Sequence, residues 1–290
     1  MIDKDAIGED LARALIAEQF PDWRDLPVRA VERQGWDNRT FRLGDDLSVR
    51  LPSADGYVAG VAKEDRWLPV LAEHLDMPVP APVAVGRPGP GYPFPWSVRR
   101  WLPGTTVRDA DHDRTALARD LGAFLVALRK VPAEGGPAAG RHSFFRGAHP
   151  GVYAGEVYEA LAALDVDAAA CREIWDAATA SEWTHEPVWF HGDVAVGNLL
   201  SLDGRLSAVI DFGTCGVGDP ACDLVMAWTH FEGEERAVFR DAAGLDDDTW
   251  RRARGWALWK ALIVMAFDAD PAQRADADRV LAQVLADPVV

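Results

Sequence analysis

The residues whose types and spacing suit catalysis lie in one stretch of the second half of the chain. Asp193 and Asn198 are five residues apart in a segment with the composition of a loop, which lets both side chains point into one cleft. Asp211 follows at the end of the apolar run 206–210, after a turn at 203–204. We therefore expect two carboxylates and one amide to share a site.

This set of side chains suits phosphoryl transfer, because the moving group is loose and anionic and the protein mainly positions it and neutralises charge. Asp193 would orient an acceptor hydroxyl and accept its proton. Asn198 and Asp211 carry oxygen atoms of the kind that Mg²⁺ prefers, and the ion would hold nucleotide phosphates. The alternative is that these residues cap a turn and end a strand, which fits any one of them better than the joined pattern.

His191, Asp193 and Asn198 form the pattern His-x-Asp-x-x-x-x-Asn, and Asp211 follows in Asp-Phe-Gly. On these residues the chain resembles the aminoglycoside phosphotransferase family, which is related in fold to protein kinases and to choline and macrolide kinases. The resemblance extends over nearly the full chain. It implies an α+β, two-lobed protein-kinase-like fold, with an antiparallel sheet plus a helix in the N-lobe and a mainly helical C-lobe.

The same resemblance implies two supporting residues around the loop. His191 is expected to pack and hydrogen-bond so that the loop keeps its shape, and Asp223 is expected to brace the loop from a buried position. A protein kinase is disfavoured, because Gly192 stands where an arginine would read an activation-loop phosphate and no Ala-Pro-Glu follows Asp211. The pattern therefore favours small acceptors.

On the nucleotide side, the resemblance points to the hairpin loop 34–40, and we take Asn38 from it as a cofactor-binding candidate. The loop lacks the Gly-x-Gly-x-x-Gly of protein kinases. Arg50 occupies the strand position where a kinase lysine meets the phosphates, and Glu64 on the next helix is its expected ion-pair partner. A guanidinium is a larger planar fork than an ammonium, so its geometry should differ. A solvated edge-strand arginine is the alternative.

The remaining candidates are assigned by position. The strand 97–102 should present backbone groups to the purine, which makes Arg100 and Leu102 cofactor-binding candidates. Carboxylates and aromatic rings in the C-terminal helices would suit an amino sugar through ion pairs and stacking. The acceptor-binding candidates among them are Trp228, Glu232, Glu235, Trp256 and Trp259.

Periodicity predicts the elements that would position these residues. Apolar residues at helical spacing predict helices over 5–20, 58–75 and 113–130, with Pro69 expected to kink or divide the second. Alternation over 28–52, with a turn at 44–46, predicts an antiparallel hairpin. We place the boundary near Pro103, giving a nucleotide-binding N-lobe over 1–102 and a C-lobe over 103–290 that carries the catalytic loop and the acceptor site.

Composition and charge restrict the setting. The chain has 290 residues, of which 49% are hydrophobic and 26% charged, as in ordinary globular proteins. Its 46 acidic and 30 basic residues give a net charge of −16, which repels nucleic acid and anionic lipid and attracts cations, although an acidic surface also serves solubility alone. The three cysteines are not closely spaced, so neither a disulfide framework nor a zinc site is indicated. The sequence also shows no basic and apolar leader and no apolar run long enough to span a membrane, and we therefore expect a cytoplasmic protein.

The sequence therefore predicts a small-molecule kinase that uses ATP or GTP with Mg²⁺ to phosphorylate a hydroxyl of an aminoglycoside-like, cationic antibiotic. A kinase for a macrolide, choline, homoserine or a sugar is the alternative within the enzyme class, because all of these share the motif. A nucleotide-binding regulator without turnover is the alternative outside that class. The intact set of Asp193, Asn198 and Asp211 argues against the regulator.

Overall fold

The chain divides into two compact units. The structure is a computed structural model that describes residues 4–35 and 37–287. The first unit runs to Gly104 and takes in Ser207–Gly213, and the second comprises Thr105–Leu206 and the residues from Thr214 onward. Strand β9 (Arg205–Val209) begins in the second unit and ends in the first.

An antiparallel sheet of five strands forms the centre of the first unit, in the order β1-β2-β3-β5-β4. The hairpin predicted between residues 28 and 52 is confirmed, and it turns at Gly44, whose φ of 61° lies in the region that glycine adopts without strain. Strand β4 lies in a proline-dense stretch in which no strand was predicted. The five strands are β1 (Val28–Ala30), β2 (Asn38–Leu43), β3 (Leu47–Pro52), β4 (Pro82–Gly86) and β5 (Trp96–Arg100).

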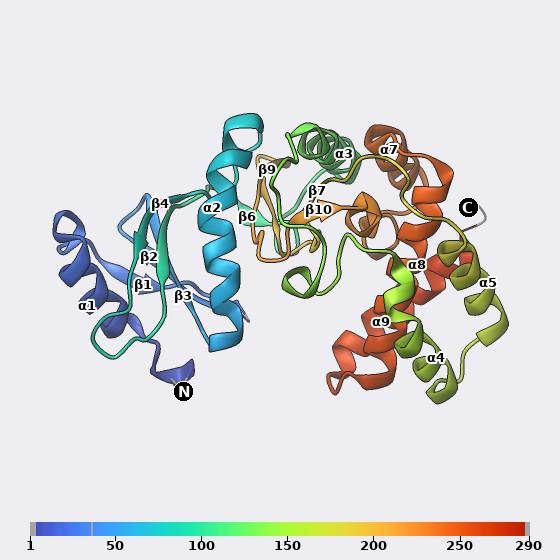
Figure 1. Ribbon diagram of the computed structural model, residues 1–290, viewed down its shortest axis with the longest axis horizontal. Coiled ribbons are helices and arrows are strands. Elements are labelled where there is room, and N and C mark those ends of the chain that lie inside the picture. Colours follow the sequence, from blue (N-terminus) through green and yellow to red (C-terminus); the bar gives the residue numbers. More distant parts are fainter. Residues whose placement is uncertain (1–3, 36, 288–290) are drawn as a thin grey trace. The chain divides into compact units, whose positions relative to one another are not determined.

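Strand alternation gives this sheet one apolar and one polar face. Val49 and Leu51 point into a core that includes Leu15 and Ile16 of helix α1 (Glu9–Gln19). Arg50, on the opposite face of β3, reaches helix α2 (Val58–His74). The two helices therefore cover opposite faces of the sheet (Figure 1).

Helix α2 runs from Val58 to His74 as one element, so Pro69 does not divide it. Proline removes one backbone donor, but the packing of Val61, Leu68 and Leu71 against the protein holds the helix as one element. Short 3-10 helices complete the first unit at Lys4–Ala6, Pro21–Trp23 and Asp55–Tyr57.

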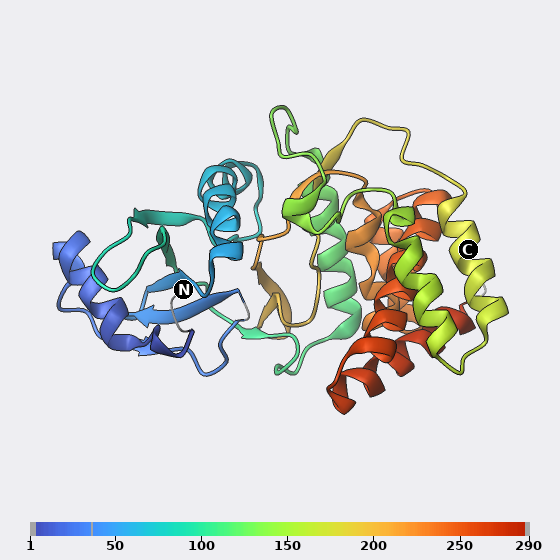
Figure 2. The ribbon, with the colours of Figure 1, turned by 60° about the horizontal axis from the view of Figure 1, so that its bottom comes forward.

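The second unit is mainly helical, as predicted. Its longest helix, α8, packs against α4, α5 and α9 (Figure 2). The predicted helix 113–130 is α3, which begins after an N-cap at Asp113. The helices are α3 (Arg114–Lys130), α4 (Ala154–Ala163), α5 (Ala168–Thr179), α6 (Met226–Thr229), α7 (Gly233–Ala243), α8 (Asp247–Phe267) and α9 (Pro271–Ala286), with 3-10 turns η4 (Arg141–Ser143), η5 (Pro150–Tyr153) and η6 (Pro220–Leu224).

Short strands frame the loop that carries the candidate residues. Strands β8 (Leu199–Leu202) and β9 form a hairpin around the turn predicted at 203–204, and β6 (Thr105–Thr106) adds a third strand. A separate antiparallel pair joins β7 (Val188–Phe190) to β10 (Gly216–Gly218). Within residues 4–35 and 37–287, no helix has both the length and the hydropathy of a membrane span.

Candidate active site

The loop after β7 places Asp193 and Asn198 in direct contact. The side-chain amide of Asn198 donates to the Asp193 carboxylate over 2.8 Å and to the Asp193 carbonyl over 2.9 Å. The backbone N–H of Asp193 donates to Nδ1 of His191, which is completely buried. The structure thus brings the three motif residues together, with Asp193 exposed and His191 inside.

Asp223 fastens the start of this loop. Its two carboxylate oxygens accept 2.7 Å hydrogen bonds from the backbone N–H groups of His191 and Gly192. Burial raises the pKa of Asp223, and the charge of His191 and these two hydrogen bonds oppose that rise. Gly192 has a φ of 84°, and a Cβ there would lie 2.9 Å from the carbonyl oxygen of Thr214, so the fastened turn requires glycine.

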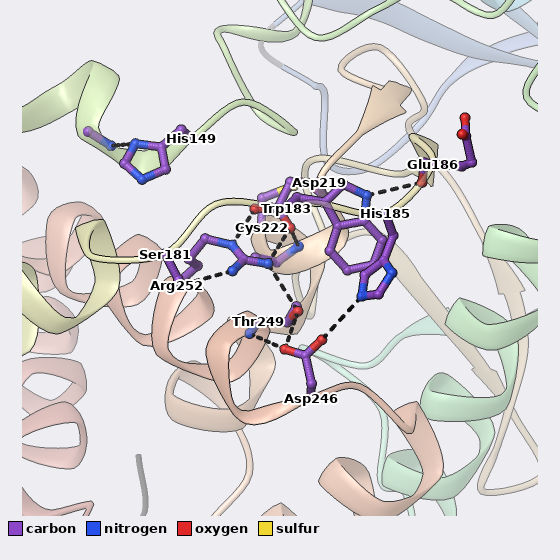
Figure 3. Close-up of polar contacts among 12 residues, drawn as sticks. His149, Ser181, Trp183, His185, Glu186, Asp219, Cys222, Asp246, Thr249 and Arg252 are labelled. Atoms are coloured by element: carbon purple, nitrogen blue, oxygen red, sulfur yellow. Dashed lines mark hydrogen bonds and ion pairs between the residues drawn. The ribbon is translucent and has the colours of Figure 1, made fainter.

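A buried ion pair holds η6, which carries Asp223. Arg252 of α8 donates to Asp219 over 2.7 Å, and both side chains are at most 5% exposed (Figure 3). Arg252 also reaches the hydroxyls of Ser181 and Thr249, each over 3.0 Å. Asp219 in turn caps η6 by accepting from the Ala221 N–H. A chain of contacts therefore runs from α8 through η6 to the loop.

In the first unit, Glu64 pairs with two arginines. Arg50 Nη1 lies 3.4 Å from Glu64 Oε1, the pairing expected from the sequence. Arg99 of β5 makes the stronger contact, with its two terminal nitrogens 3.3 and 2.9 Å from the two Glu64 oxygens. Burial alone would raise the pKa of Glu64, but Arg99 and then Arg50 outweigh it and hold the pKa at about 2. Arg99 was not predicted.

Arg50 also contacts the aspartate that follows β9. Its Nη2 atom lies 3.3 Å from Asp211 Oδ1, so one guanidinium joins Glu64 to Asp211. The Asp211 carboxyl is 40% exposed, and its backbone has a φ of 67°, a left-handed conformation that aspartate tolerates better than most residues. Arg50 is 14% exposed, which excludes the alternative of a solvated edge-strand arginine.

The other nucleotide-side candidates differ in exposure. Asn38 begins β2, is 8% exposed, and its Oδ1 atom accepts no hydrogen bond from the described residues. Arg100 ends β5 with an exposed side chain, and Leu102 is half-buried in the segment that follows. Trp36, in the loop assigned to the phosphates, lies outside the described residues.

A cavity of about 300 Å³ lies beside Asp193, entirely within the second unit. The loop 192–196 forms one side, and helices α8 and α9 form much of the rest. Two of the acceptor-binding candidates, Trp256 and Trp259, line it. Trp259 is held in place by a stacked Tyr153 ring and by a hydrogen bond from its Nε1 to Glu156.

The other acceptor candidates lie away from this cavity. Trp228 is buried, donates to Asp287, and lines a second cavity of about 280 Å³. Glu232 and Glu235 form a capping box at the start of α7, and Glu235 accepts from Arg114 over 2.8 Å. Neither glutamate lines the cavity beside Asp193.

Sequence reasoning missed the basic side chains of that cavity. Arg108, Arg146 and Lys260 line it together with Asp193. Lys260 follows Trp256 by four residues, so helical spacing could have predicted that both side chains lie on the same face of the helix. Arg108 and Arg146 lie in loops far apart in the sequence and carried no such signal.

A match to a known family covers most of the chain. Residues 28–256 match the model of the Phosphotransferase enzyme family, and the chain therefore belongs to that family. An aminoglycoside 3'-phosphotransferase of Escherichia coli is 34% identical over 74 residues, which are 23% of this chain and 27% of that enzyme. This second match spans about a quarter of the relative's length.

Solved structures show the fold over nearly the whole chain. The GDP complex of an aminoglycoside 2'-phosphotransferase-IIIa has a TM-score of 0.72 at 20% identity, over 96% of this chain and 99% of that one. A macrolide 2'-phosphotransferase from Brachybacterium faecium has a TM-score of 0.65 at 24% identity, over 94% and 97%. The expected α+β protein-kinase-like fold is thereby confirmed.

Proposed function

We propose that this protein transfers the γ-phosphoryl group of ATP or GTP to a hydroxyl of a small organic molecule. The observation that carries the proposal is the arrangement of Asp193, whose carboxylate is oriented by Asn198 and whose loop is fastened by Asp223. An exposed, oriented carboxylate beside a cavity suits the positioning of an acceptor hydroxyl and the removal of its proton.

The first unit is the proposed nucleotide-binding lobe. Arg50 is held between Glu64 and Asp211, so a cationic side chain is fixed where the family places the phosphate-binding lysine. The similar aminoglycoside 2'-phosphotransferase was solved as a complex with GDP, which supports a nucleotide donor for this fold. The second unit, with the cavity, is the proposed acceptor lobe.

Magnesium fits the side chains proposed to hold it. Among the described residues, no group of three or more carboxylate, histidine or cysteine side chains forms a metal cage. Mg²⁺ needs none, because it is commonly held by one or two protein oxygens together with phosphates and water. Asp211 and the amide oxygen of Asn198 would supply those oxygens. The bound ion would neutralise charge on the phosphates.

The acceptor is proposed as a small hydroxyl compound, and the names of the relatives supply aminoglycosides and macrolides as first candidates. A cytoplasmic location is proposed with it, since the buried cysteines Cys171, Cys215 and Cys222 lie outside any disulfide, as expected in a reducing compartment.

The test is a screen of ADP and GDP release against a panel of aminoglycosides, macrolides, amino alcohols and hydroxy acids, with and without magnesium. We expect release that depends on both acceptor and magnesium and that disappears in Asp193→Ala. Turnover that persists in Asp193→Ala, or no stimulation by any acceptor, would count against the proposal.

A further inference from the structure

The cavity beside Asp193 has basic walls in a strongly acidic protein. Arg108, Arg146 and Lys260 line it, against two carboxylates, Asp193 and Asp276. Asp276 forms an ion pair with Arg279 over 2.9 Å. In the proposed function, Asp193 binds the hydroxyl of the acceptor. The cavity therefore offers an excess of positive charge, although the chain carries a net charge of −16.

Two of the three basic side chains have hydrogen-bond donors that are not used within the described residues. The side chains of Arg108 and Lys260 make no hydrogen bond or ion pair with any residue in 4–35 or 37–287. Arg108 is placed by its backbone, whose N–H donates to the carbonyl of Val196. Its guanidinium lies over Gly197, where a Cβ would come within 2.8 Å of Nη2. The guanidinium of Arg108 therefore lies beside the loop that carries Asp193 and has no side-chain partner among the described residues.

The third group, Arg146, is held by two contacts. Arg146 lies with its guanidinium carbon 4.6 Å from the ring centre of Trp259, and its Nη1 donates to the carbonyl of Phe144. Burial and then the charge of Arg146 lower the pKa of Lys260, while the carboxylates of Asp193, Asp268 and Glu156 oppose this. An anion placed between Arg146 and Lys260 would offset the repulsion between these two cations.

The rest of the wall is apolar and aromatic. Trp256 and Trp259 contribute to the wall with only 3% and 4% of their surface exposed, and Val225, Val264 and Val280 continue it. Such a lining fits an organic body better than a chain of phosphates. The basic groups are therefore assigned to the acceptor rather than to the nucleotide.

Resting on the proposed kinase function, we propose that the acceptor carries an anionic group, such as a carboxylate, beside an apolar body and the hydroxyl that receives the phosphoryl group. A polycationic amino sugar would instead bring several ammonium groups against Arg108, Arg146 and Lys260. Glu232 and Glu235, which were expected to receive those ammonium groups, lie elsewhere, at the start of α7.

The test measures binding of three matched probes to the full chain by ligand-observed NMR. The probes are 4-hydroxyphenylacetate, tyrosol and tyramine, which share a phenol and differ in carrying an anionic, neutral or cationic end. A charge-assisted hydrogen bond should make the anion bind about tenfold more tightly than the amine. Lys260→Gln and Arg108→Gln should each weaken the anion severalfold and leave tyrosol unchanged. Arg119→Gln, on the exposed face of α3, removes the same charge outside the cavity and should change nothing.

Tighter binding of tyramine or kanamycin than of 4-hydroxyphenylacetate would overturn the inference. An affinity for 4-hydroxyphenylacetate that falls as much in Arg119→Gln as in the two cavity variants would also overturn it, and so would no binding of any probe. Because binding requires no phosphoryl transfer, a chain that prefers the anion but never turns over nucleotide would contradict the kinase function alone.

Discussion

The side-chain amide of Asn198 donates a 2.8 Å hydrogen bond to the carboxylate of Asp193. A second bond, to the Asp193 carbonyl, fixes the amide against the backbone of the same residue. The amide group therefore sets the direction of the carboxylate, while its oxygen remains available for the proposed magnesium ion.

Replacing Asn198 with alanine should lower both kcat and the affinity for Mg²⁺-nucleotide. The loss of a hydrogen bond to a charged group costs about 1.5–3 kcal/mol, or roughly tenfold to a hundredfold in rate. Steady-state kinetics and calorimetric titration of Mg²⁺-ADP measure the two effects. An unchanged kcat with an intact fold would remove Asn198 from the site.

Replacing Arg50 with methionine should raise the KM for nucleotide by about tenfold or more, because the guanidinium contacts both Glu64 and Asp211. Arg29→Met is the control, since Arg29 is exposed on β1. Nucleotide KM values from ADP release test this directly. Equal effects of the two substitutions would mean that Arg50 has no specific part in nucleotide binding.

Arg252 and its neighbour Arg251 offer a matched comparison of stability. Arg252→Ala leaves the buried Asp219 carboxylate without its counter-ion and should cost about 3–5 kcal/mol of unfolding free energy. Arg251→Ala breaks an exposed pair with Asp248 and should cost less than about 1 kcal/mol. Denaturant unfolding measures both. Similar losses would mean that the buried pair does not fasten η6.

Asp65 makes stability depend on pH. Burial raises its pKa to about 6, and its Oδ1 atom has no hydrogen-bond partner among the described residues. A carboxyl whose folded pKa is raised stabilises the fold at low pH and loses that contribution as pH rises from about 4 to 6. Asp65→Asn should therefore stabilise the protein at pH 7 and have little effect at pH 4.

Unfolding of both proteins at the two pH values checks this prediction, with Glu73→Gln as an exposed control on the same helix. A gain that is the same at pH 4 and pH 7 would show that ionisation of Asp65 is not its cause.

The motif loop could be read from the sequence because its parts are close together in the chain. Asp193 and Asn198 share one loop, and Asp211 follows after one hairpin. Arg99 could not be found in this way, because its place opposite Glu64 depends on the register of β3 and β5, which sets Arg50 against Ser97. Positional reasoning selected Arg100, which points to solvent.

The charge of the cavity was not predictable for a related reason. Arg108, Arg146 and Lys260 come from three separate segments that only the fold brings together. Glu232 and Glu235 are only three residues apart in the sequence, which made them acceptor-binding candidates, yet they cap a helix and pair with arginines. The net charge of −16 is a sum over the whole chain, so it does not give the sign of the charge inside this cavity.

The proposed role of Asp193 is tested most directly by comparing Asp193→Asn with the wild type in two measurements on the same samples. Phosphoryl transfer to the best acceptor in the screen should fall by more than about a hundredfold, because the amide cannot accept the hydroxyl proton. Affinity for Mg²⁺-nucleotide should stay close to the wild-type value, since Asp193 is proposed to act on the acceptor and not on the phosphates. A variant that keeps the wild-type kcat would show that Asp193 does not act on the acceptor hydroxyl.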